Sequence, residues 1–154
     1  MTYASKLQEL GIILVDPPKV LANYVPYQVV GNMVYISGQL PLEKGVLTHT
    51  GKVGESVSLE EGQAAARQCA VNILTQLLAA CGGDLNRVDR CVRLGGFVNC
   101  TPEFTGQPKV INGASDLMVA VFGEAGRHAR AAIGTNSLPL GASVEVEATF
   151  LLKD

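Results

Sequence analysis

The last apolar stretch of the chain decides its fold: residues 143–152 read SVEVEATFLL. Apolar side chains occupy every second position, at Val144, Val146, Ala148, Phe150 and Leu152. The positions between them are Glu145, Glu147, Thr149 and Leu151. A period of two is typical of a β-strand that has one face in a core and the other outside it. We therefore expect a sheet that is covered on one side and carries two acids and one apolar residue on the other.

Two segments earlier in the chain have the period of a helix and can supply that cover. The first begins at Ser58-Leu59-Glu60-Glu61, a capping box, and ends at Gly82-Gly83. Its apolar positions are Ala66, Ala70, Ile73, Leu77 and Leu78. The second begins near Pro108, which suits a first helical turn, and ends at Gly123. Its apolar positions are Val110, Ile111, Ala114, Leu117, Met118, Val121 and Phe122.

Shorter β-branched runs predict the remaining strands. Residues 28–30 and 33–37 form a hairpin across Gly31-Asn32, and further strands cover 88–98 and 129–134. The Gly-containing stretch 40–57 is expected to be a loop. The resulting order is β-β-α-β-α-β-β, an α+β sheet with two helices on one face. Since two helices cover only one face, we expect a closed homo-oligomer with polar pockets between its subunits.

Length and composition fit one compact domain. The chain has 154 residues, of which 47% are hydrophobic and 17% charged, so residues 1–154 are expected to form one domain, with 1–22 as an N-terminal lead-in. The net charge is −2, and without clustered positive charge nucleic-acid binding is disfavoured. The sequence contains no secretory signal and no apolar run of about 18 residues. We expect a soluble, cytoplasmic protein that does not insert into a membrane.

The sequence carries no motif for a metal or an organic cofactor. The four cysteines and two histidines have no metal-ligand spacing and stand at Cys69, Cys81, Cys91, Cys100, His49 and His128. The phosphate-binding patterns G-x-x-x-x-G-K-[ST] and G-x-G-x-x-G are absent, and so is the hydrolase pattern G-x-S-x-G. Buried free thiols are the favoured interpretation of Cys69 and Cys81, and exposed or hydrogen-bonded structural side chains that of His49 and His128.

Arg130 is the most informative polar residue of the C-terminal third. It enters the strand predicted for residues 129–134 beside Ala129, Ala131 and Ala132, small neighbours that leave room for its guanidinium. Two interpretations stand side by side. The planar fork can bind a ligand carboxylate through two hydrogen bonds, or it can form an ordinary salt bridge, for instance with Glu147 across the sheet.

Four blocks of the sequence resemble the RidA (YjgF) family of enamine and imine deaminases, once described as L-PSP endoribonucleases. The blocks are residues 23–41, 63–72, 110–112 and 129–147. The most specific elements are the Ser-Gly-Gln-Leu-Pro run at 37–41 and the spacing Arg130-(x)8-Pro139-(x)5-Glu145. The chain departs from the family at Ala132, where many members have a cysteine. It is also longer in its lead-in and in the stretches 43–54 and 101–108, which indicates a divergent subgroup.

The resemblance implies a chorismate-mutase-like (ferredoxin-like) sheet and a homotrimer. The trimer would bind small imino, enamino or keto acids in clefts between subunits, with no metal and no cofactor. In this comparison, Arg130 matches the arginine that holds the substrate carboxylate, and Glu145 matches the acid beside the attacking water. The other matching positions are Tyr24 at the cleft wall, Ser37 and Gly38 at a backbone bend, and Asn112 on the second helix.

The activity implied by the resemblance is the hydrolysis of 2-imino or 2-enamino acids, such as 2-aminoacrylate, to 2-keto acids and ammonia. This is the reaction of a 2-iminobutanoate/2-iminopropanoate deaminase. Arg130 would fix the substrate, and Glu145 would position a water against its C2 atom. Two alternatives remain open: a non-catalytic protein that binds or senses small carboxylates through the same arginine and, ranked last, an endoribonuclease.

Overall fold

The computed structural model describes residues 1–154, and its main element is a five-stranded sheet with the strand order β1-β2-β7-β5-β6. Its strands are β1 (Tyr27–Val30), β2 (Met33–Gln39), β5 (Val88–Asn99), β6 (Ala129–Thr135) and β7 (Val144–Leu152). Only β5 and β6 pair in parallel, because helix α3 (Gln107–Phe122) connects them; the other pairs are antiparallel. The α+β architecture predicted from the sequence is confirmed.

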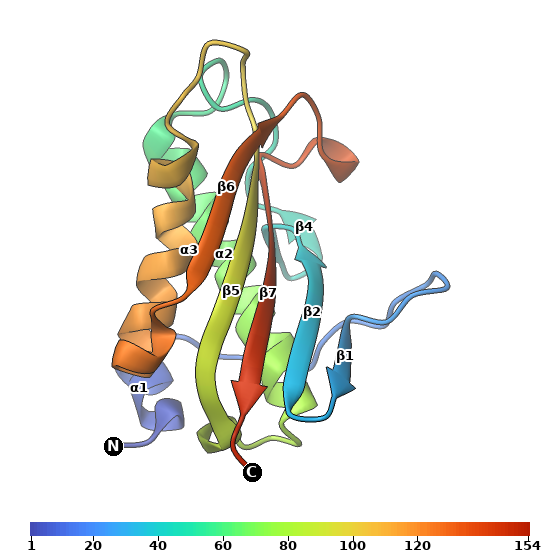
Figure 1. Ribbon diagram of the computed structural model, residues 1–154. Helices are drawn as coiled ribbons and strands as arrows, with labels where there is room; N and C mark the ends of the chain where they lie inside the picture. Colours follow the sequence, from blue (N-terminus) through green and yellow to red (C-terminus); the bar gives the residue numbers. More distant parts are fainter.

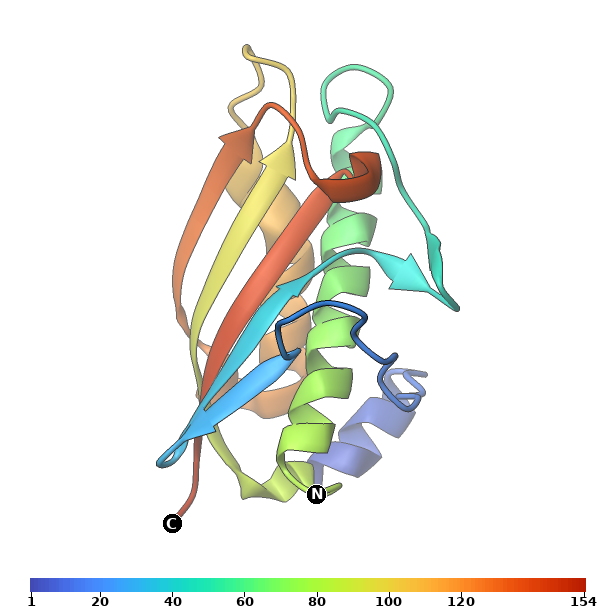
Figure 2. The same cartoon turned by 90° about the vertical axis from the view of Figure 1, so that its right-hand side faces the viewer.

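Both long helices, α2 (Leu59–Ala80) and α3, lie on one side of the sheet, and the other side carries no helix (Figure 1, Figure 2). The predicted alternation along β7 agrees with this layering. Val144, Val146 and Phe150 are completely buried under the helices, whereas Glu145 and Glu147 are half-buried on the other side. We call this second side, which has no helix, the open face.

The helix boundaries follow the local signals in the sequence. Ser58 Oγ accepts a hydrogen bond from the backbone N–H of Glu61 at 3.1 Å, and the Glu61 carboxylate accepts one from the backbone N–H of Ser58 at 2.9 Å. This is the predicted capping box. Helix α3 has Pro108 in its first turn, as expected, and ends at Gly123. In the β1–β2 hairpin, Gly31 has a φ of +59°, a conformation that favours glycine.

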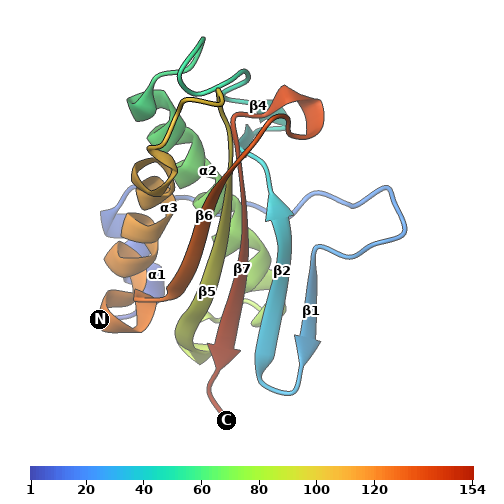
Figure 3. The same ribbon diagram turned by 45° about the horizontal axis from the view of Figure 1, so that its top comes forward.

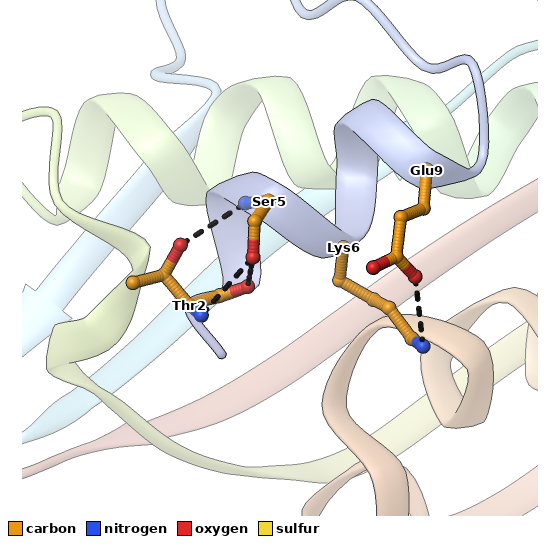
Figure 4. A network of polar contacts seen from close by, with 4 residues as sticks. All are labelled: Thr2, Ser5, Lys6 and Glu9. Atoms are coloured by element: carbon orange, nitrogen blue, oxygen red, sulfur yellow. Dashed lines mark hydrogen bonds and ion pairs between the residues drawn. The ribbon is translucent and has the colours of Figure 1, made fainter.

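Helix α1 (Tyr3–Glu9) lies inside the lead-in and was not predicted. Only Leu7 of its seven residues is buried, so the sequence shows no apolar period there. A capping box holds its first turn: Thr2 and Ser5 exchange side-chain-to-backbone hydrogen bonds, each 3.1 Å long (Figure 4). The ring of Tyr3 packs edge-on against Phe122 of α3, with a centroid distance of 4.8 Å. Tertiary contact therefore stabilises a helix that is too short to form alone.

The stretch predicted as a loop contains a second unpredicted element, the two-stranded hairpin of β3 (Leu42–Glu43) and β4 (Val46–Leu47). Two residues per strand are too few for a recognisable alternation. Three short 3-10 helices complete the fold: η1 (Leu85–Arg87), η2 (Gly123–Gly126) and η3 (Pro139–Gly141). All four cysteines are buried free thiols, which was expected for Cys69 and Cys81. No helix combines the length and the apolar character needed to cross a membrane.

Candidate functional site

Arg130 lies on the edge strand β6, on the side of the sheet that the helices cover. Its register partner on β5 is Leu94, which is completely buried on that side. The guanidinium reaches α3, where Nη1 donates to Asn112 Oδ1 at 2.8 Å and to Ser115 Oγ at 3.1 Å. Asn112 and Ser115 are three residues apart, so they share one face of the helix. The structure thus brings together two predicted site residues, Arg130 and Asn112.

The positive charge of Arg130 has no partner within the chain. The four ion pairs of the structure involve other residues, and the side chain of Arg130 is exposed. The salt bridge with Glu147, considered from the sequence, does not form. Glu147 lies on the open face, where its carboxylate is 3.5 Å from Arg93 Nη1. Within the chain, the guanidinium of Arg130 therefore has two neutral hydrogen-bond partners and no counter-ion.

Glu145 lies on β7 and points to the open face, beside Gly38 of β2. A Cβ atom at position 38 would lie 2.9 Å from both Cδ and Oε1 of Glu145, so only glycine leaves room for this carboxyl group. Burial raises the pKa of Glu145 above its ordinary value of 4.5, and the nearby charge of Glu147 raises it further. A carboxyl group with a raised pKa exchanges protons more readily near neutral pH.

Glu147 repeats this arrangement two residues further along β7. A Cβ atom at Gly95 of β5 would lie 2.7 Å from Glu147 Oε1, so glycine again makes room for a carboxylate. Arg93, Gly95 and Glu147 were not identified as site residues from the sequence. The alternation along β7 was their only signal, because it places Glu147 on the same face as Glu145.

Ser37 connects the segment before β1 to the end of β2. Its Oγ donates to the backbone oxygen of Val25 at 2.9 Å, and this contact ties down the segment that carries Tyr24. The segment projects beyond the β1 edge of the sheet (Figure 3), and the Tyr24 side chain is 60% exposed. Tyr24, Ser37 and Gly38 therefore belong to the β1–β2 side of the molecule.

The predicted residues form two groups rather than one. Arg130 and Asn112 lie at the β6 edge, on the helix side. Gly38 and Glu145 are in contact on the open face, and Ser37 is the neighbour of Gly38 in β2. Since β1 and β6 are at opposite ends of the strand order, the segment with Tyr24 is also remote from Arg130.

His128, which the sequence analysis assigned a structural role, lies close to Arg130. Its Nε2 is 2.9 Å from Ser115 Oγ, the hydroxyl that also contacts Arg130, and its Nδ1 is 2.6 Å from the backbone oxygen of Gly126. Burial is the main cause that lowers the pKa of His128 below its ordinary value of 6.5; the hydrogen bond to Gly126 opposes this shift, and the charge of Arg130 adds to it. The spacing of two residues between His128 and Arg130 was the available signal. The structure contains no group of three or more side chains suited to bind a metal ion.

These features define a class of protein: a small α+β domain of chorismate-mutase-like form that presents an unpaired arginine at one sheet edge and a carboxyl group on its open face. A family model described as "YjgF/chorismate mutase-like, putative endoribonuclease" matches residues 4–150. The chain belongs to this family, the YjgF/RidA family, as its motifs indicated.

Closely similar proteins occur in distant organisms. Protein TCP17 of Trypanosoma cruzi is 51% identical over 152 residues, which cover 98% of this chain and 94% of that protein. The crystal structure of Atu1372, a protein of unknown function from Agrobacterium tumefaciens, is 50% identical with a TM-score of 0.92, covering 99% of this chain and 94% of that chain. A structure from Shewanella oneidensis MR-1 is 37% identical with a TM-score of 0.94, covering 99% and 100%.

A more distant structure, E. coli TdcF with bound serine, has a TM-score of 0.65 and is 20% identical, covering 92% of this chain and 98% of that chain. At this identity, the likeness shows that the two proteins share a fold.

Proposed function

We propose that this protein hydrolyses 2-imino and 2-enamino acids, such as 2-aminoacrylate, to 2-keto acids and ammonia. The proposal rests on the hydrogen bonding of the Arg130 guanidinium. Both hydrogen bonds of its guanidinium use Nη1 and neutral acceptors, so Nη2 and Nε are free for a second partner. An exposed, unpaired guanidinium held in this way suits a small carboxylate, which can accept two parallel N–H···O bonds.

The opposite directions of Arg130 and Glu145 support a site built by two copies of the chain. Arg130 points to the helix side and Glu145 to the open face, so a ligand that touches both needs a second copy. The open face also carries exposed apolar side chains, including Tyr35 at 47% and Ile133 at 51% exposure. A homotrimer, the assembly that the family resemblance implies, would bury this face and bring the two groups together.

In the proposed reaction, Arg130 holds the substrate carboxylate, and Asn112 fixes the direction of the guanidinium. The C2 atom of an imino acid is electrophilic, and water adds to it to give a carbinolamine, which then expels ammonia. Glu145 of the neighbouring copy orients the attacking water. Holding both reactants in one geometry supplies much of the rate acceleration. Tyr24, Ser37 and Gly38 complete the wall on the Glu145 side.

A trapping assay tests the proposal. An amino-acid oxidase or a serine/threonine dehydratase generates the imine, and semicarbazide competes with the protein for it. We expect the wild type to reduce semicarbazone formation and Arg130→Ala to lose this effect. Arg90→Ala is the matched control, because Arg90 is also an exposed arginine but is paired with Asp89 at 2.8 Å. Unchanged trapping by the wild type, across several amino-acid donors, would contradict deamination.

A second function uses the same arginine without chemistry: the protein binds or senses a small carboxylate. The unpaired charge of Arg130 favours this function as well, and the bound serine of the TdcF structure is a small carboxylate on a shared fold. Glu145→Gln separates the two functions. A deaminase loses turnover and keeps its affinity for 2-keto acids, whereas a binding protein has no turnover to lose.

The family description also names an endoribonuclease. RNA contacts require clustered positive charge, and the net charge of this chain is −2. We rank this activity below the other two, and a steep salt dependence of RNA binding would reverse that order.

A further inference from the structure

Ser115 and His128 form a hydrogen-bonded pair directly beside Arg130. Ser115 Oγ lies 2.9 Å from His128 Nε2, and Arg130 Nη1 donates to the same oxygen at 3.1 Å. Ser115 comes from α3, and His128 precedes β6, two residues before Arg130. Both side chains are half-buried. The pair therefore adjoins the guanidinium that would hold the substrate carboxylate.

The direction of each hydrogen bond follows from its partners. His128 Nδ1 lies 2.6 Å from the backbone oxygen of Gly126, and because a carbonyl oxygen only accepts, Nδ1 carries the ring proton. In the neutral ring, Nε2 then presents a lone pair. Arg130 only donates, so the Ser115 oxygen accepts from it. The Ser115 hydroxyl therefore donates its own proton to His128 Nε2.

The surroundings of the pair set the protonation state of the imidazole before the transfer. Burial is the main cause of the lowered pKa of His128; the hydrogen bond to Gly126 opposes the shift and Arg130 adds to it. The imidazole is therefore neutral at pH 7 and presents its Nε2 lone pair to Ser115. The adjacent guanidinium stabilises negative charge that develops on Ser115 Oγ. The other charged side chains near this turn, Arg127 and Glu124, are exposed and pair with each other at 3.0 Å.

No carboxylate of the same chain forms an ion pair with Arg130 or His128. Arg130 takes part in none of the ion pairs, and Glu145 points to the opposite face of the sheet. A hydrogen bond that only held α3 against the start of β6 would need no more than one donor and one acceptor. Here the acceptor is a titratable base that faces a hydroxyl in contact with a cation, which is the arrangement that activates a hydroxyl for proton transfer.

We propose that Ser115 and His128 form a proton relay for the imine hydrolysis, an inference that rests on the proposed function. When water adds to C2, the new O–C2 bond forms, the C=N π electrons move to nitrogen, and a water proton passes through Ser115 Oγ to His128 Nε2. The imidazolium then returns a proton to the nitrogen, which gives the carbinolamine. The relay next moves the carbinolamine hydroxyl proton to nitrogen, the C–N bond breaks, and C2=O forms. One water is consumed, one ammonia leaves, and the relay is restored.

Steady-state kinetics between about pH 5 and pH 9 test the relay. In His128→Asn, the side-chain amide can still donate to Gly126, but the base is lost. We expect kcat to fall by about 10²-fold, with KM nearly unchanged. The part of the acidic decline in the wild-type rate that comes from protonation of His128 should disappear in the variant, and the part that comes from Glu145 should stay. Ser115→Ala removes the hydroxyl and leaves the ring in place, so it should show the same loss. His49→Asn is the control, because the His49 side chain forms its hydrogen bond with the neighbouring Thr48 side chain and with no residue around Arg130.

The outcomes separate the relay from the proposed function. If either variant folds and keeps the wild-type kcat and its acidic limb, the relay is overturned, while wild-type turnover leaves deamination intact. If the wild type binds 2-keto acids through Arg130 but hydrolyses no imine, deamination and the relay fail together. Thermal unfolding of each variant shows whether a loss of rate reflects a loss of fold, and Ser115→Ala provides the result if His128→Asn does not fold.

Discussion

Arg130 and Glu145 project from opposite faces of the same sheet. In the strand register, Arg130 lies beside Leu94 of β5 and Glu145 lies beside Phe97. Positions 94 and 97 are three apart in a part of β5 that has no register shift, so their side chains point to opposite sides. A single chain cannot direct both groups at one small ligand. A site that uses both must therefore lie between two copies of the chain.

Complementation between inactive variants tests this two-copy site. Arg130→Ala and Glu145→Gln each remove one group, and we expect each variant alone to be nearly inactive. When equal amounts are unfolded and refolded together, random assembly pairs an intact Arg130 with an intact Glu145 at one interface in four. The trapping assay should then recover about a quarter of the wild-type activity.

Each variant refolded alone provides the control for this mixture. If both groups act within one chain, no mixed assembly contains a complete site. Activity of the mixture that does not exceed the average of the separate variants would then exclude a site shared between copies.

The affinity for a 2-keto acid should depend on the shape of the Arg130 side chain as well as on its charge. Lysine keeps the charge but lacks the planar fork that pairs with both carboxylate oxygens. We expect Arg130→Lys to weaken binding by about 10-fold and Arg130→Ala by about 100-fold, the range for charged hydrogen bonds. Calorimetric titration with pyruvate measures both. Wild-type affinity in both variants would show that the carboxylate binds elsewhere.

The sequence predicted those features of the fold that repeat over several residues. Alternation along residues 143–152 and the two amphipathic helices were sufficient for the layering, and the capping box at Ser58 was correct to the residue. Helix α1 and the β3–β4 hairpin were not predicted because each is too short for its period to repeat often enough to be recognised. Tertiary contacts, such as that of Tyr3 with Phe122, determine these elements.

Less of the candidate site could be predicted from the sequence. The family resemblance pointed to Arg130, Asn112 and Glu145, but it did not show that Arg130 and Glu145 face opposite ways. That result needs the strand register, which residue spacing alone does not supply. The contact between Ser115 and His128 joins a helix to the segment before a strand, and no local pattern encodes it.

The carboxyl group of Glu145 should make stability depend on pH. Its pKa is raised in the folded protein, first by burial and then by Glu147, so between pH 4.5 and the folded pKa the native state binds more protons than the unfolded state. The free energy of unfolding therefore falls as pH rises through that window. Glu145→Gln removes the titrating group and with it this fall in the free energy of unfolding. We expect its thermal midpoint to exceed that of the wild type by about 2 °C at pH 7 and to match it near pH 4.

Glu124→Gln serves as the control for this measurement, because Glu124 is an exposed acid whose only ion pair is with Arg127. Its thermal midpoint should follow that of the wild type at both pH values. An equal midpoint for wild type and Glu145→Gln at pH 7 would mean that the fold does not disfavour the charged form of Glu145.

Two glycines on the open face offer the sharpest test of Glu145 itself. In Gly38→Ala, the new methyl group would lie 2.9 Å from the Glu145 carboxyl group and displace it. The displaced atoms are the end of a flexible side chain, so the sheet should survive. We expect kcat to fall by about 10-fold or more, because a misplaced group loses its catalytic geometry, while affinity for 2-keto acids stays with Arg130. Gly95→Ala crowds Glu147 and Arg93 instead and should keep most of the wild-type kcat. If both substitutions lower kcat equally, the loss reflects a general disturbance of the open face, and the specific role of Glu145 is wrong.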